Sequence, residues 1–349
     1  MDKLKLGVIG CGGMEKVHES GLSELDNVKV VATADIIKER ADRAAEIYGA
    51  EYAYTDFRDM LDKVDACLLV VPHHLHYGIG RECLEAGKHV LMEKPFCNTE
   101  EQCLELAHIA QSKGLTLMTA YCMRFNPMVL KLKEMLDSGE YGPCFQMSIW
   151  TEQLTRYPID HWASLAATIG GGQLFSHGCH YIDLLLWFMG NPVKGTHTGT
   201  NFGTPWMEKE GTSNVSILFE NGAIGYHFGT WGAHGSRLKY SIHAHCTGGM
   251  LEAALSEGKL YRHLPGKAPE VVFEYRMGKH TQYEVGHFAD CIANGTKPIT
   301  GVPESLQGLR VIWRLYNAEE NDFVADLSGL GLTEPWDFVS SDPGDRRGF

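Results

Sequence analysis

Short apolar runs alternate with helix-forming stretches through the first 120 residues, and this alternation constrains the fold more than any other feature. The apolar runs, each typical of a buried strand, are residues 4–10, 28–35, 65–72, 88–95 and 115–121. The segments with helical spacing between them are 14–25, 38–49, 79–87 and 100–114. Strands joined by helical crossovers run parallel, because each crossover returns the chain to the same end of the sheet. The pattern therefore predicts a doubly wound α/β domain.

The pattern changes after about residue 122. Segments 144–152, 215–231 and 238–248 alternate apolar and polar residues and are followed or interrupted by glycine-containing turns. Such segments are typical of a largely antiparallel sheet. Residues 128–142 and 303–321 have the spacing of helices. We expect two domains, residues 1–122 and residues 123–349, since 349 residues exceed one ordinary core.

Composition excludes several classes of protein. The formal net charge is −13 and no basic stretch occurs, which argues against nucleic acid or an anionic membrane surface as a partner. The N-terminus lacks a basic leader followed by a long apolar run, and no apolar stretch reaches the roughly 18 residues of a membrane span. The ten cysteines are scattered, as in a protein with reduced thiols. We expect a cytoplasmic protein.

The sequence Gly-Cys-Gly-Gly-Met-Glu, residues 10–15, follows the first strand and opens the first helix. This is the context of a dinucleotide-binding turn, in which Gly10 permits the tight turn and Gly12 lets the backbone approach the pyrophosphate. Glu15 stands where the motif has its third glycine, and Gly13 can relieve part of that difference. A glycine-rich turn without a ligand is the alternative interpretation.

Asp35 ends the second strand and strengthens the cofactor prediction. A carboxylate there accepts hydrogen bonds from the adenosine ribose and repels a 2′-phosphate, so the sequence favours NAD over NADP. Arg40, one turn into the next helix, could soften that preference. The alternative is that Asp35 caps this helix.

The fourth strand ends on Glu93, Lys94 and Pro95. Ligands of a doubly wound sheet bind beyond the carboxyl ends of its strands, which places these residues at the expected crevice. The bond before Pro95 can be cis, which would turn the chain sharply and fix Lys94. Lys94 beside a nicotinamide could stabilise a developing alkoxide. The alternative is a Glu–Lys ion pair at the surface.

Four stretches together resemble a known family: GVIGCGGM, PHHLHYGIGRECLEAGKHVLMEKPF, YCMRFNP and GGGQLFSHGCHYIDLLLWFMGNP. The chain is similar up to about Pro192 to the glucose–fructose oxidoreductase/inositol dehydrogenase (Gfo/Idh/MocA) family. The resemblance implies a Rossmann domain followed by an α/β domain with a large open sheet for substrate binding and oligomerisation. It also implies NAD- or NADP-dependent oxidation or reduction of sugars and polyols, and a homodimer or homotetramer. One branch of the family cleaves glycosides through a transient redox cycle.

The resemblance also implies roles for individual residues. The residues it assigns to the cofactor are Gly10, Gly12, Gly13, Met14, Asp35, Pro72, His73, His76, Glu93, Lys94 and Arg124. Lys94 and His180 would be catalytic. Many relatives have an aspartate four residues before that histidine, but here the position is Ser176, followed by His177. Serine is a poor base near neutral pH and histidine is a good one, so His177 could assist or could simply lie near the site.

Aromatic residues are the remaining candidates for sugar binding. Tyr157, His161 and Trp162 could stack on the apolar face of a sugar, as could Trp150 and Trp231, although aromatic residues at such spacing are more often part of a core. Asp183 could orient His180 or only support packing. The 17 histidines form no motif typical of a metal site, so we expect no metal.

These observations predict an NAD-dependent oxidoreductase that transfers a hydride at a ring carbinol of a sugar, glycoside or polyol. An alternative enzyme is a redox-assisted glycoside hydrolase. It would oxidise C3, eliminate the substituent at C1 after removing the C2 proton, add water, and reduce the ketone again. A third hypothesis, from a different class, is a non-catalytic NAD-binding sensor. The sensor predicts loss of the lysine–histidine pair, and both residues are present.

Overall fold

The computed structural model describes residues 3–332, and the first domain is built on a six-stranded parallel sheet in the order β3-β2-β1-β4-β5-β6. Its strands are β1 (Leu4–Ile9), β2 (Val28–Ala34), β3 (Tyr52–Tyr54), β4 (Ala66–Leu69), β5 (His89–Met92) and β6 (Leu117–Thr119). The helices between them are α1 (Glu15–Leu22), α2 (Lys38–Tyr48), α3 (His76–Glu85) and α4 (Glu100–Ser112). The predicted doubly wound domain is confirmed. The sequence analysis missed β3, whose three residues are only half-buried.

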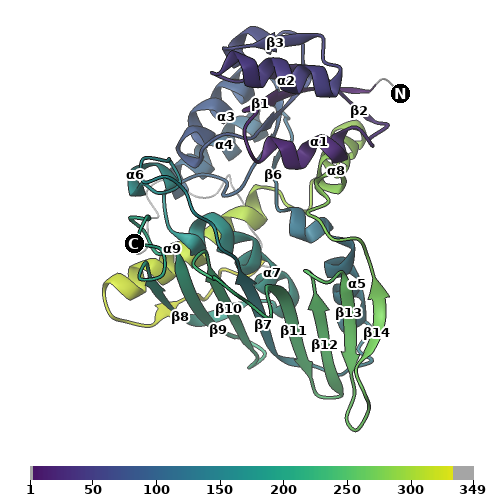
Figure 1. The fold of residues 1–349 in the computed structure, drawn as a ribbon, viewed down its shortest axis with the longest axis vertical. Helices are drawn as coiled ribbons and strands as arrows, with labels where there is room; N and C mark the ends of the chain where they lie inside the picture. The colour runs from purple at the N-terminus through teal and green to yellow at the C-terminus, as the bar shows by residue number, and fades with distance from the viewer. Residues whose placement is uncertain (1–2, 333–349) are drawn as a thin grey trace.

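The strands are apolar throughout because helices bury both faces of the sheet. One face carries Ile9, Leu69 and Met92 and packs against α3 and α4. The other carries Leu6, Val8 and Leu91 and packs against α1 and α8 (Thr281–Asn294). Figure 1 shows α8, from late in the chain, beside α1 at the top of the molecule.

The second domain is built on a nine-stranded sheet in the order β14-β13-β12-β11-β7-β10-β9-β8-β15. Its strands are β7 (Cys144–Glu152), β8 (Pro192–Thr200), β9 (Thr212–Phe219), β10 (Ile224–Thr230), β11 (Tyr240–Cys246), β12 (Gly249–Ala254), β13 (Lys259–His263), β14 (Glu270–Glu274) and β15 (Ala325–Asp326). Neighbouring strands are antiparallel except β7 and β10, which are parallel. The predicted mostly antiparallel sheet is confirmed.

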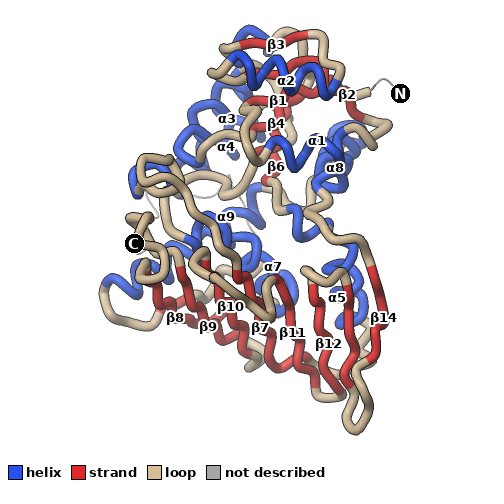
Figure 2. Tube along the Cα trace, viewed as in Figure 1, coloured by secondary structure: helices blue, strands red, loops and turns tan. Residues whose placement is uncertain are grey.

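Helices of the second domain lie against its sheet, as Figure 2 shows in blue against the red strands. They are α5 (Pro127–Asp137), α7 (Cys179–Met189) and α9 (Val302–Glu320), and a short helix, α6 (Ala166–Ile169), contacts residues 73–75 of the first domain (Figure 1). Asn126 caps α5: its side-chain oxygen accepts a hydrogen bond from the Met128 N–H at 2.9 Å, and Pro127 is the first helical residue. Among residues 3–332 no helix is both long and apolar enough to cross a membrane.

The chain crosses between the two sheets more than once. It leaves the first domain after β6, builds the second sheet as far as β14, and returns as α8 to the first sheet. It then enters the second domain again with α9. The division at residues 122/123 stays a prediction, and α8 lies on the first-domain side in space although it follows that boundary in sequence.

Candidate functional site

A cavity of about 1210 Å³ lies between the carboxyl ends of the first sheet and the second domain. This volume exceeds the 300–1,000 Å³ typical of one small-molecule site, so the cavity has room for a dinucleotide and a second molecule. All but three of the residues predicted to bind cofactor or substrate line it. They are Gly10, Gly12, Gly13, Met14, Asp35, Arg40, Pro72, His73, Glu93, Lys94, Tyr157, His161, Trp162, Ser176, His177, His180 and Trp231.

The glycine turn fits a dinucleotide. Gly10 has a φ of +90°, and a β-carbon there would lie 2.3 Å from the carbonyl oxygen of Val70. Only glycine fits that position without strain. Gly12 and Gly13 have no neighbouring atom within 4 Å of where a β-carbon would lie, and both line the cavity. Their missing side chains leave space at the start of α1, where a pyrophosphate would bind.

Glu15, in place of the third glycine, is directed away from this space and toward α2. Its carboxylate accepts hydrogen bonds at 2.6 Å from the Arg43 guanidinium and from the Tyr48 hydroxyl. Glu15 is fully buried, and burial raises its pKa despite these partners. Glu15, which stands in place of the third glycine of the motif, therefore joins α1 to α2 and leaves the cavity open.

Asp35 holds the end of β2 against the glycine turn. Its carboxylate accepts hydrogen bonds from the backbone N–H of Cys11 and of Ile37, both at 2.8 Å. Asp35 also lines the cavity, as does the exposed Arg40 on α2. Asp35 does not cap the following helix, because the N-cap residue of α2 is Ile37 and no side chain caps it. One carboxylate can accept several hydrogen bonds, so Asp35 keeps acceptor capacity for a ribose hydroxyl.

The strand end at Glu93, Lys94 and Pro95 faces the cavity, and the Lys94–Pro95 bond is cis. The Lys94 ammonium donates a hydrogen bond to the backbone carbonyl of Ser176 at 3.2 Å. That contact joins the first domain to the turn before α7. An ammonium has three donors, so Lys94 keeps hydrogen-bonding capacity for a ligand.

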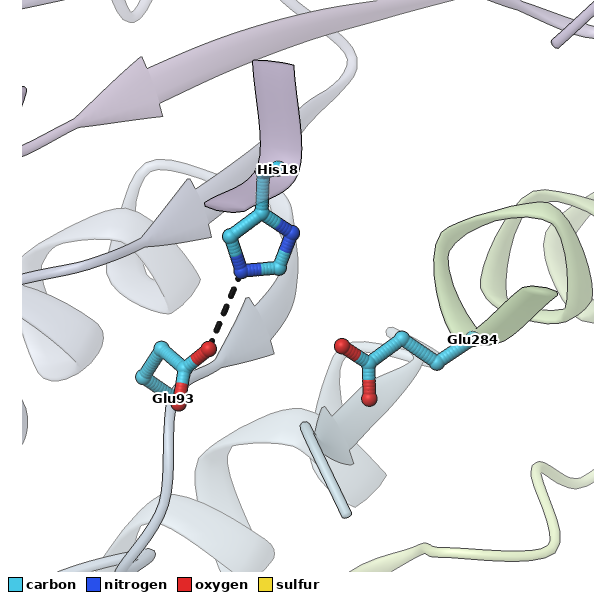
Figure 3. A group of neighbouring side chains, drawn as sticks. All are labelled: His18, Glu93 and Glu284. Carbon is cyan, nitrogen blue, oxygen red and sulfur yellow. Dashed lines mark hydrogen bonds and ion pairs between the residues drawn. The ribbon is translucent and has the colours of Figure 1, made fainter. Parts of the chain in front are cut away.

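Glu93 belongs to a buried group of three side chains from three elements (Figure 3). Its Oε1 lies 3.0 Å from Nε2 of His18 on α1. Burial alone would raise the pKa of Glu93, but the hydrogen bond from His18 and the charges of His18, Lys94 and Lys279 lower it to about 2. Glu93 is therefore a carboxylate, whereas the sequence analysis considered only its neighbour Lys94 as a partner.

Glu284 on α8 completes this group. Its side chain points toward His18 and Glu93 in Figure 3, is fully buried, and has no hydrogen-bond partner for either oxygen. Burial and then the negative charge of Glu93 raise the pKa of Glu284 well above its ordinary value. Burial and the neighbouring carboxylate thus favour the protonated form of Glu284. Sequence reasoning missed it, because nothing in the local pattern of α8 distinguishes it from a solvated glutamate.

Three possible ligand atoms of His18, Glu93 and Glu284 lie within 4.8 Å of one another, which makes this the one group with metal-ligand spacing in residues 3–332. The His18 Nδ1 atom has no hydrogen-bond partner. Metal-bound histidines almost always donate their second ring N–H to a partner. The expectation that the protein holds no metal stays a prediction.

His177 and His180 lie one turn apart where a π-helical turn (Leu174–Gly178) continues into α7. Their ring centroids are 6.2 Å apart. Burial and then the charge of Lys94 lower the pKa of both imidazoles well below the ordinary value. Both rings are neutral near pH 7, and His180 Nδ1 has no partner in the protein. A neutral imidazole can accept a proton. Ser176 lies in the same turn, as the sequence predicts.

Tyr240 and Gln153 are further cavity residues that sequence reasoning missed. The Tyr240 hydroxyl lies 3.4 Å from His177 Nε2 and donates a hydrogen bond to the Gln153 side chain. Gln173 lies 3.4 Å from the other ring nitrogen of His177. These contacts hold the His177 ring. The alternation of β11 shows that one of its faces is polar, but only the tertiary fold brings Tyr240 to His177.

Aromatic side chains form the wall of the cavity in the second domain. The rings of Tyr157 and His161 are stacked with centroids 4.6 Å apart, and Trp162 lies 4.7 Å from His73. Trp231 also lines the cavity. Trp150 does not: it packs against Tyr226 and Phe228 on the sheet. The wall suits the apolar face of a sugar ring.

His76 and Arg124 do not line the cavity, contrary to the roles that the resemblance implies. The ring nitrogens of His76 lie 2.8 Å from the Pro95 carbonyl oxygen and 3.0 Å from that of Val71, so His76 supports the loop that carries Lys94. Arg124 is buried and forms two hydrogen bonds of 2.7 Å with Asp183. Asp183 is thereby committed to Arg124 and does not orient His180.

Comparison with known proteins agrees with this geometry. The family model described as "Oxidoreductase family, NAD-binding Rossmann fold" matches residues 4–121, and the "GFO/IDH/MocA C-terminal domain" model matches residues 129–252. The chain is 25% identical to scyllo-inositol 2-dehydrogenase (NAD(+)) of Bacillus subtilis over 85% of this chain and 88% of that protein. It is 30% identical to D-glucoside 3-dehydrogenase of Escherichia coli over 54% of this chain and 55% of that protein, about half of each.

The fold is also that of solved structures. A levoglucosan dehydrogenase in complex with NADH superposes with a TM-score of 0.85 at 20% identity, covering 93% of this chain and 99% of that one. At this identity the likeness establishes the fold alone. The cofactor prediction, NAD, is confirmed by the family model of the NAD-binding Rossmann fold.

We predict that Asp35→Asn reduces the ratio by which the protein binds NADH more tightly than NADPH. Asparagine keeps an acceptor for the Cys11 N–H but removes the charge that repels a 2′-phosphate. The dissociation constants for NADH and for NADPH are measured by fluorescence titration, and their ratio gives the preference. Asp42→Asn on the exposed face of α2 is the control and should leave the ratio unchanged. Equal affinity of the unmodified protein for the two cofactors would refute the role of Asp35.

We predict that Glu284→Gln stabilises the protein increasingly as the pH rises from about 5 to 8. The pKa of Glu284 is raised in the folded state, so the folded protein binds a proton that the unfolded chain releases above its ordinary pKa of 4.5. Stability therefore falls with rising pH in this window, by up to about 1.4 kcal/mol per pH unit. Glutamine does not titrate, so Glu284→Gln should lack this pH dependence of stability. Urea unfolding at several pH values measures the free energy of unfolding of both proteins.

Glu101→Gln on the exposed surface of α4 is the control for this experiment and should not change the pH dependence. If the stability difference between Glu284→Gln and the unmodified protein were constant over this pH range, Glu284 would not titrate as the structure indicates.

Proposed function

This chain belongs to the Gfo/Idh/MocA family of oxidoreductases, and we propose that it oxidises a ring carbinol of a sugar, glycoside or polyol with NAD as the hydride acceptor. The observation that carries the proposal is that the Lys94 ammonium and two neutral imidazoles line the same cavity as the glycine turn. The aromatic wall of Tyr157 and Trp162 adds a surface on which a sugar ring can stack.

In this proposal, Lys94 stabilises the substrate oxygen and His180 accepts its proton. NAD, when bound, supplies the group that accepts the hydride. Lys94 stabilises the negative charge that develops on the substrate oxygen, because its ammonium is fixed at the Ser176 carbonyl and has donors to spare. His180 takes the hydroxyl proton, since its ring is neutral and its Nδ1 has no protein partner. Ser176 can hydrogen-bond a second hydroxyl but cannot serve as the base.

Relatives support this class of substrate. The names of two of them describe oxidation of a cyclitol and of a D-glucoside. Both substrates are neutral and carry several hydroxyl groups on a ring. The substrate wall of this chain is likewise formed by aromatic and uncharged side chains, among them Tyr157, Trp162 and Trp231. We infer a neutral carbohydrate or polyol as the substrate.

We predict that Lys94→Ala lowers the turnover number by about 100-fold or more, the usual effect of losing one donor to a developing oxyanion. The fold and NADH binding should remain nearly intact. Lys94→Arg should also be poor, because a planar guanidinium does not replace a compact ammonium. Steady-state kinetics with the best substrate measures the loss, and Lys267→Ala in the exposed β13–β14 hairpin is the control. Normal turnover by Lys94→Ala would show that Glu93, Lys94 and Pro95 have only a structural role.

The experiment that tests the function uses a panel of sugars, polyols and aryl glycosides with NAD in deuterated water. We expect NADH to accumulate in step with substrate loss, with no deuterium at C2. Release of the aglycone with deuterium at C2 and no net NADH would instead identify the redox-assisted glycoside hydrolase. Binding of NADH without reaction of any substrate on the panel would favour the sensor.

A further inference from the structure

The segment that connects β14 to α8 brings a cation from late in the chain to the glycine turn. Residues 275–279 line the cavity, and α8 begins two residues later at Thr281. We propose that Lys279 binds the pyrophosphate of NAD, so that the return segment holds the cofactor from the side opposite to the glycine turn. This inference rests on the cofactor and not on the proposed substrate.

The position of Lys279 is the first observation. Its ammonium nitrogen lies 3.5 Å from the sulfur of Met14, the last residue before α1. The pyrophosphate of a dinucleotide binds at this end of the first helix. The positive charge of Lys279 also contributes to lowering the pKa of Glu93, His177 and His180. Lys279 therefore lies at the start of α1, next to the glycine turn at which the pyrophosphate would bind.

The second observation concerns the groups that could balance the positive charge of the Lys279 ammonium. In the part of the chain that the structure describes, no carboxylate lies within ion-pairing distance of the Lys279 ammonium. A thioether sulfur is only a weak acceptor and does not compensate a positive charge. The charge of Lys279 acts on Glu93 and on Glu284, but Glu93 is already bound to His18 and neither carboxyl group forms an ion pair with Lys279 among the described residues. An exposed lysine without a carboxylate partner, directed at an anion-binding turn, is suited to bind two adjacent phosphates.

The third observation is that the segment is held in place. His280, between Lys279 and α8, has a φ of +57°, a left-handed conformation that is uncommon for residues other than glycine. Its ring is buried and lies 2.9 Å from the Arg276 carbonyl oxygen through Nε2. The ring of Tyr275 packs against it at 5.1 Å. Such conformations persist only where the surroundings impose them, and they are concentrated at ligand clamps and active sites.

Other cations near the turn are less suited to the pyrophosphate. Arg43 is committed to Glu15 and Glu19, and Arg40 lies on the side of Asp35, where the ribose would bind. Lys16 lines the cavity and, together with Lys279, a second hollow between α1 and residues 276–282, but it belongs to the first turn of α1 itself and does not face that turn from the opposite side. Lys16 therefore provides a matched control: it carries the same charge beside the same turn but belongs to the first domain.

The experiment compares Lys279→Met with Lys279→Arg, Lys16→Met and Lys267→Met. Dissociation constants for NADH, ADP and AMP are measured by titration at low and high salt, and thermal unfolding confirms that each variant is folded. We expect Lys279→Met to weaken NADH and ADP by about tenfold or more, the scale of one charge-assisted hydrogen bond. AMP should be affected much less, and the salt dependence of NADH binding should decrease.

Lys279→Arg should recover most of the affinity, and Lys16→Met and Lys267→Met should bind NADH like the unmodified protein. The proposal is overturned if Lys279→Met binds NADH and ADP normally, if it weakens AMP as much as ADP, or if Lys16→Met has the same effect. Because each readout is binding of a cofactor or its fragments, the result does not depend on whether a substrate has been found.

Discussion

The buried contact between His18 and Glu93 is the interaction on which the rest of the site depends. It joins α1 to the end of β5, and α8 covers it with Glu284, whose pKa is raised by burial and by the charge of Glu93. A charged carboxylate is costly in a core unless it is paired. Because Glu93 is paired, the chain can leave the sheet at this point and present Lys94 to the cavity.

The site is assembled from both domains, and the chain crosses between them to build it. The first domain supplies the glycine turn, Asp35 and Lys94. The second supplies His177, His180 and the aromatic wall. The hydrogen bond from Lys94 to the Ser176 carbonyl joins the two sets directly. Relative movement of the domains would therefore change the position of the ammonium with respect to the imidazoles, so the packing of α8 on the first sheet also stabilises the catalytic arrangement.

The family resemblance leads us to expect an acid at the position of Ser176, and the serine has an electrostatic consequence. An aspartate in this turn would place a negative charge beside Lys94, His177 and His180 and would favour their protonated forms. With serine, burial and the Lys94 charge act without that opposition, and both imidazoles are neutral. In the proposed mechanism the proton-accepting role then falls to a histidine, and the Tyr240 and Gln173 contacts fix the ring of His177.

Local sequence determined the parallel sheet, the glycine turn, the position of Asp35 and the strand end that carries Lys94, because each depends on residues close together in the chain. It could not determine the roles of His76, Arg124 and Glu284. His76 and Arg124 appear in motifs shared with cofactor-binding proteins, yet their hydrogen bonds go to backbone carbonyls and to Asp183. Glu284 acquires its raised pKa only when α8 packs on Glu93, 191 positions earlier in the chain. Burial and electrostatic coupling arise from residues distant in sequence, so only the tertiary structure decided which polar groups face the cavity and which support it.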